Sequence, residues 1–173
     1  HVVEFLDHIT PGIDREVSRE FMKILQKQGI KFHLETKVSS IKKTKDAVII
    51  NSKNKDGKEI KFDCDVVLIS VGRKPKTTNL NLEKVGVKLN SKKRIEINKN
   101  FQTSVKNIYA IGDVVEGPML AHKAEEEGIA VAEIIAGQYG HVNYDIIPGV
   151  IYTSPEVACI GKTEEQLKET KVD

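Results

Sequence analysis

Two stretches of the chain repeat apolar residues with the period of an amphipathic helix. In the first, residues 15–28, apolar side chains recur every three or four positions, Asp14 is placed to cap the start, and Gly29 is placed to end the helix. The second, residues 119–136, follows Pro118 and is rich in alanine and glycine, which allow a neighbouring backbone to approach closely. The sequence therefore predicts two substantial helices.

The residues around these helices carry the patterns of β-strands. Short apolar runs without alternation are typical of strands buried on both faces, and they occupy 1–5, 30–34, 64–71 and 108–111. Alternating apolar and polar residues occupy 38–43, 47–52 and 58–62. The turn signal Asp56-Gly57 predicts that 47–52 and 58–62 pair as antiparallel strands. The pattern indicates an α/β fold with an antiparallel insert.

Two changes of pattern divide the chain. A polar, loop-like run follows Pro75 and leads to a short expected strand at 95–97. From Tyr144 the run VIYTSPEVACIG predicts β-structure, and Thr163 with Gln166 forms a capping box for a last helix at 164–170. We therefore expect three parts, with the boundaries 1–75, 76–143 and 144–173.

Composition excludes several classes of function. Of 173 residues 39% are apolar, the net charge is +2, and the lysines are scattered, so no nucleic-acid partner is expected. No apolar run reaches the ~18 residues of a membrane span. Cys64 and Cys159 have no C-x-x-C or zinc spacing, so we expect free thiols and no metal site. The chain begins without methionine inside a strand pattern, so we expect a segment of a longer protein.

The stretch TSVKNIYAIGD, residues 103–113, is the best candidate for a binding site. Gly112 ends an apolar run and lets another molecule approach the backbone. Asp113 follows at the expected mouth of the sheet, where a carboxylate can accept hydrogen bonds from paired sugar or polyol hydroxyls. The same residues also fit a buried strand that ends in a turn, with Asp113 capping a local group.

The pattern T-x-x-x-x-I-Y-A-I-G-D resembles the second flavin motif of the FAD- and NAD(P)-dependent disulfide oxidoreductases. The following GPMLAHKAEEEG, residues 117–128, is similar to the dihydrolipoamide dehydrogenases within that family. The runs VVEFLDHITPGID, LQKQGIKF, VGRKP, IYTSPEVACIG and KTEEQLKE resemble the same group in the same order. The resemblance covers essentially the whole chain.

The resemblance implies an incomplete Rossmann-like NAD-binding domain in 1–75, a central FAD-contacting segment in 76–143, and the start of an α+β dimer-interface domain in 144–173. It implies FAD and NAD as cofactors. Asp113 would bind the ribityl chain of FAD, and four residues would line the flavin ring: Met119, Leu120, Ala121 and His122.

Three further residues are implied on the NAD side. Glu4 would accept hydrogen bonds from the adenosine ribose, Val38 would contact the adenine, and Gly72 would lie beside the nicotinamide. From the residues alone, Glu4 fits an exposed loop-entry carboxylate, Val38 an ordinary strand residue, and Gly72 a strand-to-loop glycine equally well.

The implied activity of the full-length protein is oxidation of dihydrolipoyl groups through an enzyme disulfide and FAD, with NAD⁺ as electron acceptor. The implied partners are a second copy of the protein and the lipoyl-bearing carrier domains of 2-oxoacid dehydrogenase or glycine cleavage complexes, in the mitochondrial matrix or bacterial cytoplasm. None of the family's catalytic residues falls within these 173 positions, so the segment alone is expected to be inactive.

Two alternatives stay open. One is another flavin disulfide reductase, of the glutathione or mercuric reductase type, which GPMLAHKAEEEG disfavours. The other is a non-catalytic nucleotide-binding or oligomerisation fragment, which the missing glycine fingerprints and redox cysteines favour.

Overall fold

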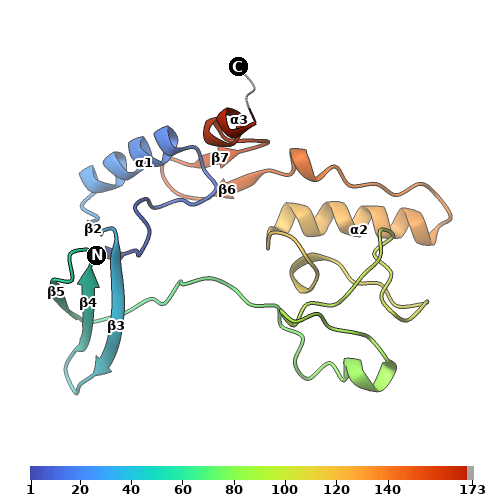
Figure 1. The fold of residues 1–173 in the computed structure, drawn as a ribbon, viewed down its shortest axis with the longest axis horizontal. Coiled ribbons are helices and arrows are strands. Elements are labelled where there is room, and N and C mark those ends of the chain that lie inside the picture. The colour runs from blue at the N-terminus through green and yellow to red at the C-terminus, as the bar shows by residue number, and fades with distance from the viewer. Residues whose placement is uncertain (171–173) are drawn as a thin grey trace. The chain divides into compact units, whose positions relative to one another are not determined.

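The computed structural model of the protein describes residues 1–170 and consists of two compact units (Figure 1). The first unit contains His1–Ser70, Tyr152–Val157 and the C-terminal residues from Lys162 onward. The second contains Val71–Ile151 and Ala158–Gly161. Of the predicted site residues, Glu4 and Val38 are therefore in the first unit, and Gly72 and Asp113 are in the second.

The first unit begins with a β–α–β connection. Strand β1 (Val2–Val3) and strand β2 (Phe32–His33) are parallel neighbours, and helix α1 (Arg15–Lys27) connects them. A parallel pair joined by a helix is the building unit of dinucleotide-binding folds. The predicted α/β character of this part is confirmed, although both strands are only two residues long.

Both ends of α1 are set by the residues that the sequence pointed to. The side chain of Asp14 accepts a hydrogen bond from the amide of Glu16 at 3.0 Å. At the other end Gly29 has a φ of +101°, and the amide of Ile30 donates to the carbonyl of Leu25 at 3.1 Å. This is the Schellman arrangement, which needs a left-handed residue directly after the helix.

The predicted antiparallel insert is present as a three-stranded sheet. Its strands are β3 (Thr36–Lys43), β4 (Val48–Asn54) and β5 (Glu59–Cys64), in that order across the sheet. The turn before β5 is closed by the amide of Gly57, which donates to the carbonyl of Asn54 at 3.0 Å.

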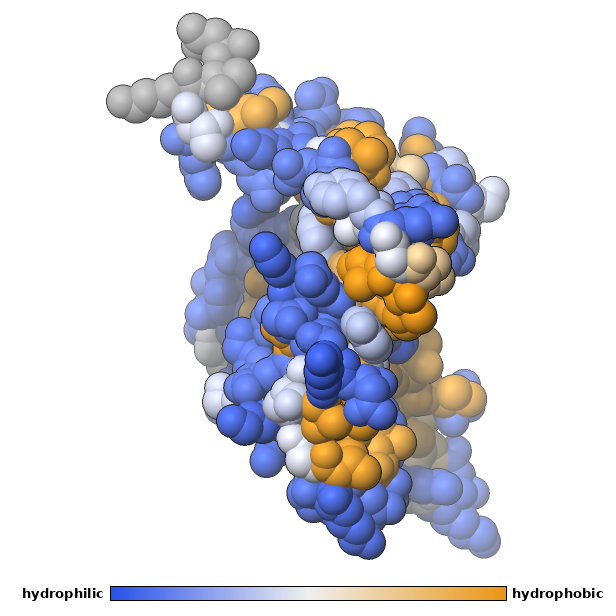
Figure 2. Space-filling model, turned by 90° about the vertical axis from the view of Figure 1, so that its right-hand side faces the viewer, coloured by the Kyte–Doolittle hydropathy of each residue, from blue (hydrophilic) through white to orange (hydrophobic). Residues whose placement is uncertain are grey.

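The prediction of a buried strand at 64–71 is wrong. Strand β5 ends at Cys64, and no strand within residues 1–170 pairs with the residues that follow. An apolar run is buried on both faces only where neighbouring strands and helices cover it. Four large side chains are instead 66–92% exposed: Val66, Leu68, Ile69 and Val71. Figure 2 shows, on one face of the molecule, that hydrophobic residues gather in patches between hydrophilic ones.

The second unit is built around helix α2 (Ala121–Ile135) and has little regular strand. Three short 3₁₀ helices accompany it: η1 (Leu82–Val85), η2 (Gly112–Val114) and η3 (Tyr144–Ile146). The strands expected at 95–97 and 108–111 are each reduced to one isolated bridge, Leu89 with Ile95 and Gln102 with Tyr109.

Asparagine side chains turn the chain on both sides of the strand expected at 95–97. The side-chain oxygen of Asn90 accepts from the amides of Lys92 and Arg94. Asn98 makes the same kind of contact with the amides of Asn100 and Gln102. Such local bonds offer the backbone an alternative to a strand ladder, so this strand is limited to one isolated bridge.

Two hydrophobic clusters form the core of the second unit. The first contains Val87, Ile95, Ala110 and Val115, and the second contains Phe101, Ala130 and Val142. The predicted close approach to α2 is also present, because a Cβ on Gly140 would lie 2.1 Å from the carbonyl oxygen of Ala130. Only a glycine lets the returning chain lie so near the helix.

The C-terminal part has the predicted β-structure and capped helix. Strands β6 (Gly149–Ile151) and β7 (Val157–Cys159) pair with each other. Helix α3 (Glu164–Glu169) starts at a capping box in which Thr163 and Gln166 exchange side-chain to backbone hydrogen bonds. In the part of the chain that the structure describes, no helix has the length and apolar character needed to cross a membrane.

Candidate functional site

The flavin-side candidate is a loop that turns sharply through η2 against α2. Gly112 has a φ of +71°, and a Cβ there would lie 3.2 Å from the Cβ of Ala124 on α2. Both the left-handed backbone and the tight contact favour glycine at this position. Asp113 follows, with its side chain 36% exposed. The carboxylate is therefore held next to a helix while part of it is open to a ligand.

The carboxylate of Asp113 has a partner that the sequence did not predict. The guanidinium of Arg73 donates to its Oδ2 at 2.6 Å. Arg73 follows Gly72, whose φ is +112°, so the structure brings the VGRKP loop to the Gly112–Asp113 turn. An ionised carboxylate can accept about four hydrogen bonds, so the contact leaves capacity for hydroxyl groups.

Beneath this loop lies a buried ion pair. Lys123 and Glu127, one turn apart on α2, are about 1% exposed and 2.9 Å apart. Glu127 accepts from the amide of Gly112 at 2.7 Å, and Lys123 donates to the carbonyl of Gly112 at 3.1 Å. Both backbone groups of the residue before Asp113 are thus bound by the pair.

Tyr144 completes this network from the segment that follows α2. Its hydroxyl donates to Oε1 of Glu127 at 2.9 Å. Burial and this hydrogen bond to a carboxylate raise the pKa of Tyr144 to about 12. Glu127 lies in the second turn of α2, which begins at Ala121, and its side chain is buried. The i, i+4 spacing of Lys123 and Glu127 was the available signal.

The four residues predicted to line the flavin ring lie where α2 begins. Met119 and Leu120 precede the helix, and Ala121 and His122 are its first two residues. Leu120 occupies the capping position and has no side chain that can accept from the first amides. The start of α2 therefore carries amide donors and a positive dipole end that a side-chain cap does not satisfy. Such a terminus suits an electron-rich group of a ligand.

On the NAD side, Glu4 is tied into the end of the parallel pair. Its amide donates to the carbonyl of His33 at 3.0 Å, and its carbonyl accepts from the amide of Thr36 at 2.9 Å. Oε1 of its carboxylate accepts from the amide of Leu6 at 2.9 Å. Val38 lies on β3, two residues after Thr36, and its side chain is exposed. The structure thus brings Glu4 close to the start of the strand that carries Val38.

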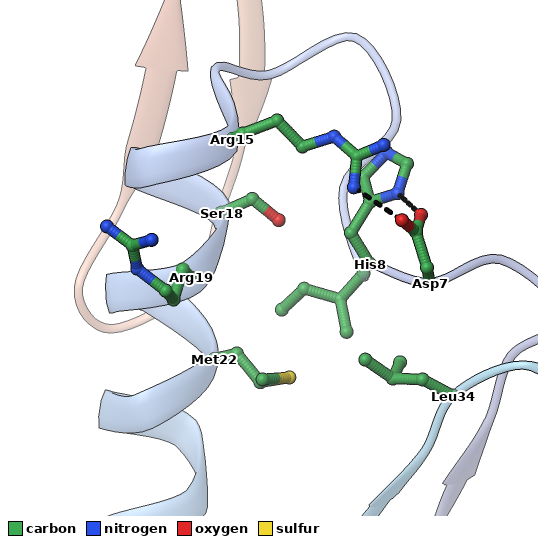
Figure 3. Close-up of a pocket in the computed structure, with 8 residues that line it drawn as sticks. Asp7, His8, Arg15, Ser18, Arg19, Met22 and Leu34 are labelled. Atoms are coloured by element: carbon green, nitrogen blue, oxygen red, sulfur yellow. Dashed lines mark hydrogen bonds and ion pairs between the residues drawn. The ribbon is translucent and has the colours of Figure 1, made fainter.

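A cavity of about 400 Å³ lies between the loop after β1 and helix α1 (Figure 3). Its lining combines charged and apolar side chains: Asp7, His8, Ile9, Arg15, Ser18, Arg19, Met22 and Leu34. Arg15 donates to Asp7 at 2.8 Å, and the ring of His8 hydrogen bonds to the same carboxyl at 2.7 Å. These two contacts lower the pKa of Asp7 to about 2. The sequence carried no recognisable motif for this cavity.

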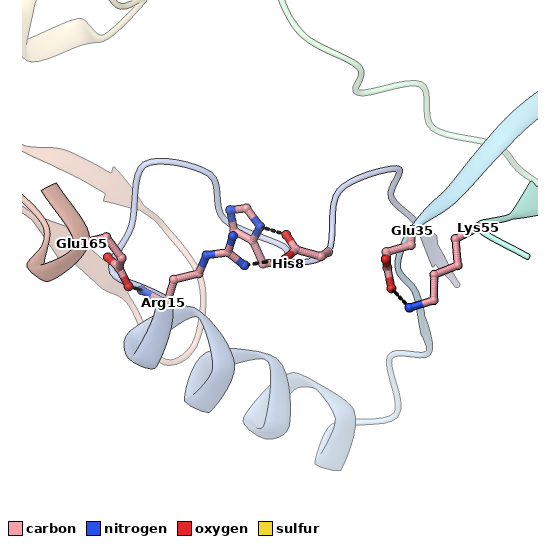
Figure 4. A network of polar contacts seen from close by, with 6 residues as sticks. His8, Arg15, Glu35, Lys55 and Glu165 are labelled. Carbon is pink, nitrogen blue, oxygen red and sulfur yellow. Dashed lines mark hydrogen bonds and ion pairs between the residues drawn. The ribbon is translucent and has the colours of Figure 1, made fainter. Parts of the chain in front are cut away.

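The starts of α1 and α3 cap each other (Figure 4). The amide of Arg15 donates to Oε1 of Glu165 at 3.2 Å. In return the amide of Glu164 donates to Oδ2 of Asp14 at 3.2 Å, and this hydrogen bond lowers the pKa of that carboxyl. Each helix therefore supplies a carboxylate to the positive end of the other.

Comparison with known proteins identifies the family. The sequence model of the pyridine nucleotide-disulphide oxidoreductases matches residues 1–128, and the model of their dimerisation domain matches residues 147–173. Among solved structures, the HOCl-induced flavoprotein disulfide reductase RclA from Escherichia coli matches with a TM-score of 0.86 at 26% identity. That match covers 99% of this chain and 39% of the other.

Curated relatives are closer in sequence. The mitochondrial dihydrolipoyl dehydrogenases of Pisum sativum and Bos taurus are 51% and 53% identical over 99% of this chain. Leghemoglobin reductase of Glycine max is 50% identical over the same share. The chain spans about a third of the length of these relatives, 33–34%.

These matches confirm the predicted fold class and the predicted cofactors of the family, a flavin and a pyridine nucleotide. The dimerisation-domain match also supports a homodimer. The matched regions together extend from His1 to Asp173, and only 129–146 lies outside both. The chain belongs to the pyridine nucleotide-disulphide oxidoreductase family.

Proposed function

We propose that the chain is a segment of a dihydrolipoyl dehydrogenase, which oxidises protein-bound dihydrolipoamide through a redox disulfide and FAD and reduces NAD⁺. The identity of 51–53% to proteins of that name, over 99% of the chain, supports this function over that of RclA at 26%. Because the chain spans about a third of those relatives, the activity belongs to the full-length protein. We expect the isolated segment to be inactive.

The observation that carries the proposal is the partly exposed carboxylate of Asp113 on a loop fixed against α2. This geometry fits a polyol chain, because the carboxylate can accept from hydroxyl groups while its own backbone stays in place. The uncapped start of α2 fits the polar edge of a flavin ring bordered by Met119, Leu120, Ala121 and His122. Bound FAD would supply the two-electron chemistry that connects a dithiol with a nicotinamide.

The NAD-side roles follow the same logic. Glu4 would accept the adenosine ribose hydroxyls, since the amide of Leu6 already holds one of its oxygens in place. Val38 is exposed on β3 and would pack on the adenine. Gly72, with its left-handed backbone, would let the nicotinamide half approach the loop.

The domain division, partners and compartment belong to the same proposal. Residues 1–75 would contribute to the NAD domain, 76–143 to the FAD-contacting segment, and 144–173 to the dimer interface. The partners would be a second copy of the protein and lipoyl-bearing carrier domains. The relatives are named as mitochondrial proteins, which favours the mitochondrial matrix.

The test is made on the full-length protein. Its flavin absorption would be recorded, together with NAD⁺ reduction by dihydrolipoamide and, for comparison, NADPH oxidation by glutathione disulfide. Rapid turnover of glutathione disulfide without dihydrolipoamide oxidation would replace the proposal by another flavin disulfide reductase. A protein without flavin would favour the non-catalytic nucleotide-binding or oligomerisation fragment.

Replacing Asp113 tests the site itself. Loss of hydrogen bonds to a charged group costs roughly 1.5–3 kcal/mol, so Asp113→Ala should weaken FAD binding by roughly ten- to a hundredfold. The matched control is Asp63→Ala, which removes an exposed carboxylate from β5. If flavin content after dialysis is the same in both variants, Asp113 does not bind the flavin.

A further inference from the structure

The largest fully buried side chains of the described residues include two charged ones, Lys123 and Glu127. Removing two charges from water is costly, and a buried ion pair adds little stability over apolar side chains of the same volume. The proposed contacts with FAD and NAD do not use either residue. Stability alone therefore gives no reason for two charges at these positions.

The contacts of the pair are directed at the two backbone groups of one residue, Gly112. Glu127 accepts from the amide of Gly112 at 2.7 Å, and Lys123 donates to the carbonyl of the same residue at 3.1 Å. Two hydrogen bonds on opposite sides of one residue fix the orientation of its backbone. Asp113 is attached directly to that residue, so the direction in which its carboxylate leaves the loop is set by the pair.

The pair is itself held in one conformation. The hydroxyl of Tyr144 donates to Glu127 at 2.9 Å. On the other side, a Cβ on Gly117 would lie 2.7 Å from Cε of Lys123, so the loop passes directly over the lysine stem. Neither charged side chain can change rotamer without losing a hydrogen bond or moving the loop.

We propose that Lys123 and Glu127 are positioning residues that hold the backbone on both sides of Gly112, and through it the Asp113 carboxylate, in the geometry that binds the ribityl hydroxyls of the flavin. The inference rests on the proposed function and deepens it. A carboxylate on a fixed loop loses less freedom on binding than one on a mobile loop, so the pair increases flavin affinity without touching the flavin.

The test compares variants of the full-length flavoprotein. Glu127→Gln keeps an acceptor for Gly112 but leaves Lys123 without its counter-charge, and Tyr144→Phe removes one hydrogen bond while both charges remain. The matched control is Glu126→Gln, an exposed position on the same helix. A second control, Phe62→Leu, removes core packing in the other unit and lowers stability alone.

The measurement is the rate of FAD release, followed by flavin fluorescence well below every melting temperature, together with the visible flavin spectrum. We expect release about tenfold faster in Glu127→Gln, equivalent to a factor of ten in affinity, and a smaller acceleration in Tyr144→Phe. Both should shift the flavin spectrum. Glu126→Gln and Phe62→Leu should match the wild type in both measurements.

The outcomes separate this inference from the proposed function. In one outcome Asp113→Asn releases flavin, whereas Glu127→Gln and Tyr144→Phe release it no faster than Phe62→Leu at an equal loss of melting temperature. The positioning role is then wrong and the proposed function stands. If the wild type holds no flavin, the proposed function fails and the positioning role fails with it. Should Glu127→Gln not fold, wild-type FAD release and spectrum in Tyr144→Phe overturn the inference.

Discussion

Gly117 shows how one residue can be required by a neighbouring side chain as well as by its own backbone. Its φ is +110°, and an added Cβ would meet Cε of Lys123 at 2.7 Å. Gly137 also has a positive φ, +76°, but open space around it. Left-handed backbone costs other residues about 1–2 kcal/mol, and only at Gly117 is a steric clash added.

We therefore expect Gly117→Ala to destabilise the full-length protein more than Gly137→Ala. Gly137→Ala carries only the cost of the left-handed backbone. The additional loss of stability in Gly117→Ala therefore measures the contact with Lys123. Thermal melting with and without added FAD would give both values. Equal losses in the two variants would show that the loop moves away from the lysine without penalty.

The ribose contact proposed for Glu4 predicts which of NAD and NADP the full-length protein prefers. Its carboxylate can accept from both ribose hydroxyls of NAD, through bonds of roughly 1.5–3 kcal/mol each. The 2′-phosphate of NADP would replace a donor by a negative charge, and like charges brought together can cost several kcal/mol. We expect strong preference for NAD⁺, and Glu4→Ala should lower efficiency with NAD⁺ while narrowing the gap to NADP⁺.

The measurement is kcat/KM with both cofactors in wild type and variant. Glu59→Ala, which removes an exposed glutamate from β5, is the control and should leave the ratio unchanged. A wild type that uses both cofactors equally, or a ratio that Glu4→Ala does not move, would remove Glu4 from the ribose site.

Tyr144 makes the buried network sensitive to high pH. Its pKa is raised to about 12, above the value near 10 of an unfolded tyrosine. The hydrogen bond to Glu127 therefore contributes its full stability below about pH 10 and loses it as the pH rises through about 12. The melting-temperature difference between wild type and Tyr144→Phe should be constant up to about pH 10 and shrink above it. A difference that does not depend on pH would contradict this titration.

Asp113 and Gly112 could be singled out from sequence because their roles depend on adjacent residues. Gly112 was expected to let another molecule approach the backbone, and that stays a prediction; within the chain its close neighbour is Ala124 of α2. The contact of Arg73 with Asp113 joins residues 40 positions apart, and no local pattern encodes it. The Glu127 contact with Tyr144 was missed for the same reason.

At the scale of elements, the helix ends in the first unit depend on one another. Asp14 accepts from the first turn of α1 and from the amide of Glu164 at the start of α3. Asp14→Ala should therefore lower the melting temperature more than Thr163→Ala, which removes a cap from α3 alone. Equal effects would mean that the contact between the two helix starts adds nothing.

The stabilisation by Asp14 should depend on pH. Hydrogen bonding to the amides of Glu164 and Glu16 lowers the pKa of Asp14 in the folded protein. Its contribution is thus present above the unfolded pKa of about 3.9 and disappears as the pH falls through the lower folded value. The melting temperatures of wild type and Asp14→Ala should converge in strong acid. A difference in melting temperature that stays constant with pH would exclude titration of Asp14 as the cause.

Helices were predicted well because their signals are local. Asp14, Gly29 and the Thr163–Gln166 capping box all act within a few residues of the ends that they set. A strand depends on a partner that can be far away in sequence. The three antiparallel strands were predicted correctly because a tight turn supplies each partner. The strand predicted at 64–71 does not form, because no described strand lies beside it.

For the whole molecule, the exposed apolar side chains at 66–71 are the main liability. They are followed by an exposed loop and offer both apolar surface and unpaired backbone. Such a run favours pairing with another chain. We expect the isolated 173-residue chain to self-associate, to bind no flavin and to show no lipoamide activity. Leu68→Lys should reduce the association, because a charge on an unpaired edge opposes it.

Light scattering at several concentrations would measure this association. The control is Lys61→Ala, a change of charge within the paired strand β5. A monomer that melts cooperatively at all concentrations would contradict the expectation, and so would association that Leu68→Lys leaves unchanged.

The buried network also limits how this sequence can evolve. An isolated buried ion pair can often be exchanged for two apolar residues without loss. Here the exchange would leave the buried amide of Gly112 without its partner, at about 1–3 kcal/mol, and would remove the acceptor of the Tyr144 hydroxyl. Changing Lys123 or Glu127 alone leaves one buried charge uncompensated, at about 3–5 kcal/mol. A single substitution at Lys123 or Glu127 therefore begins with a large loss of stability, which opposes replacing the pair one residue at a time.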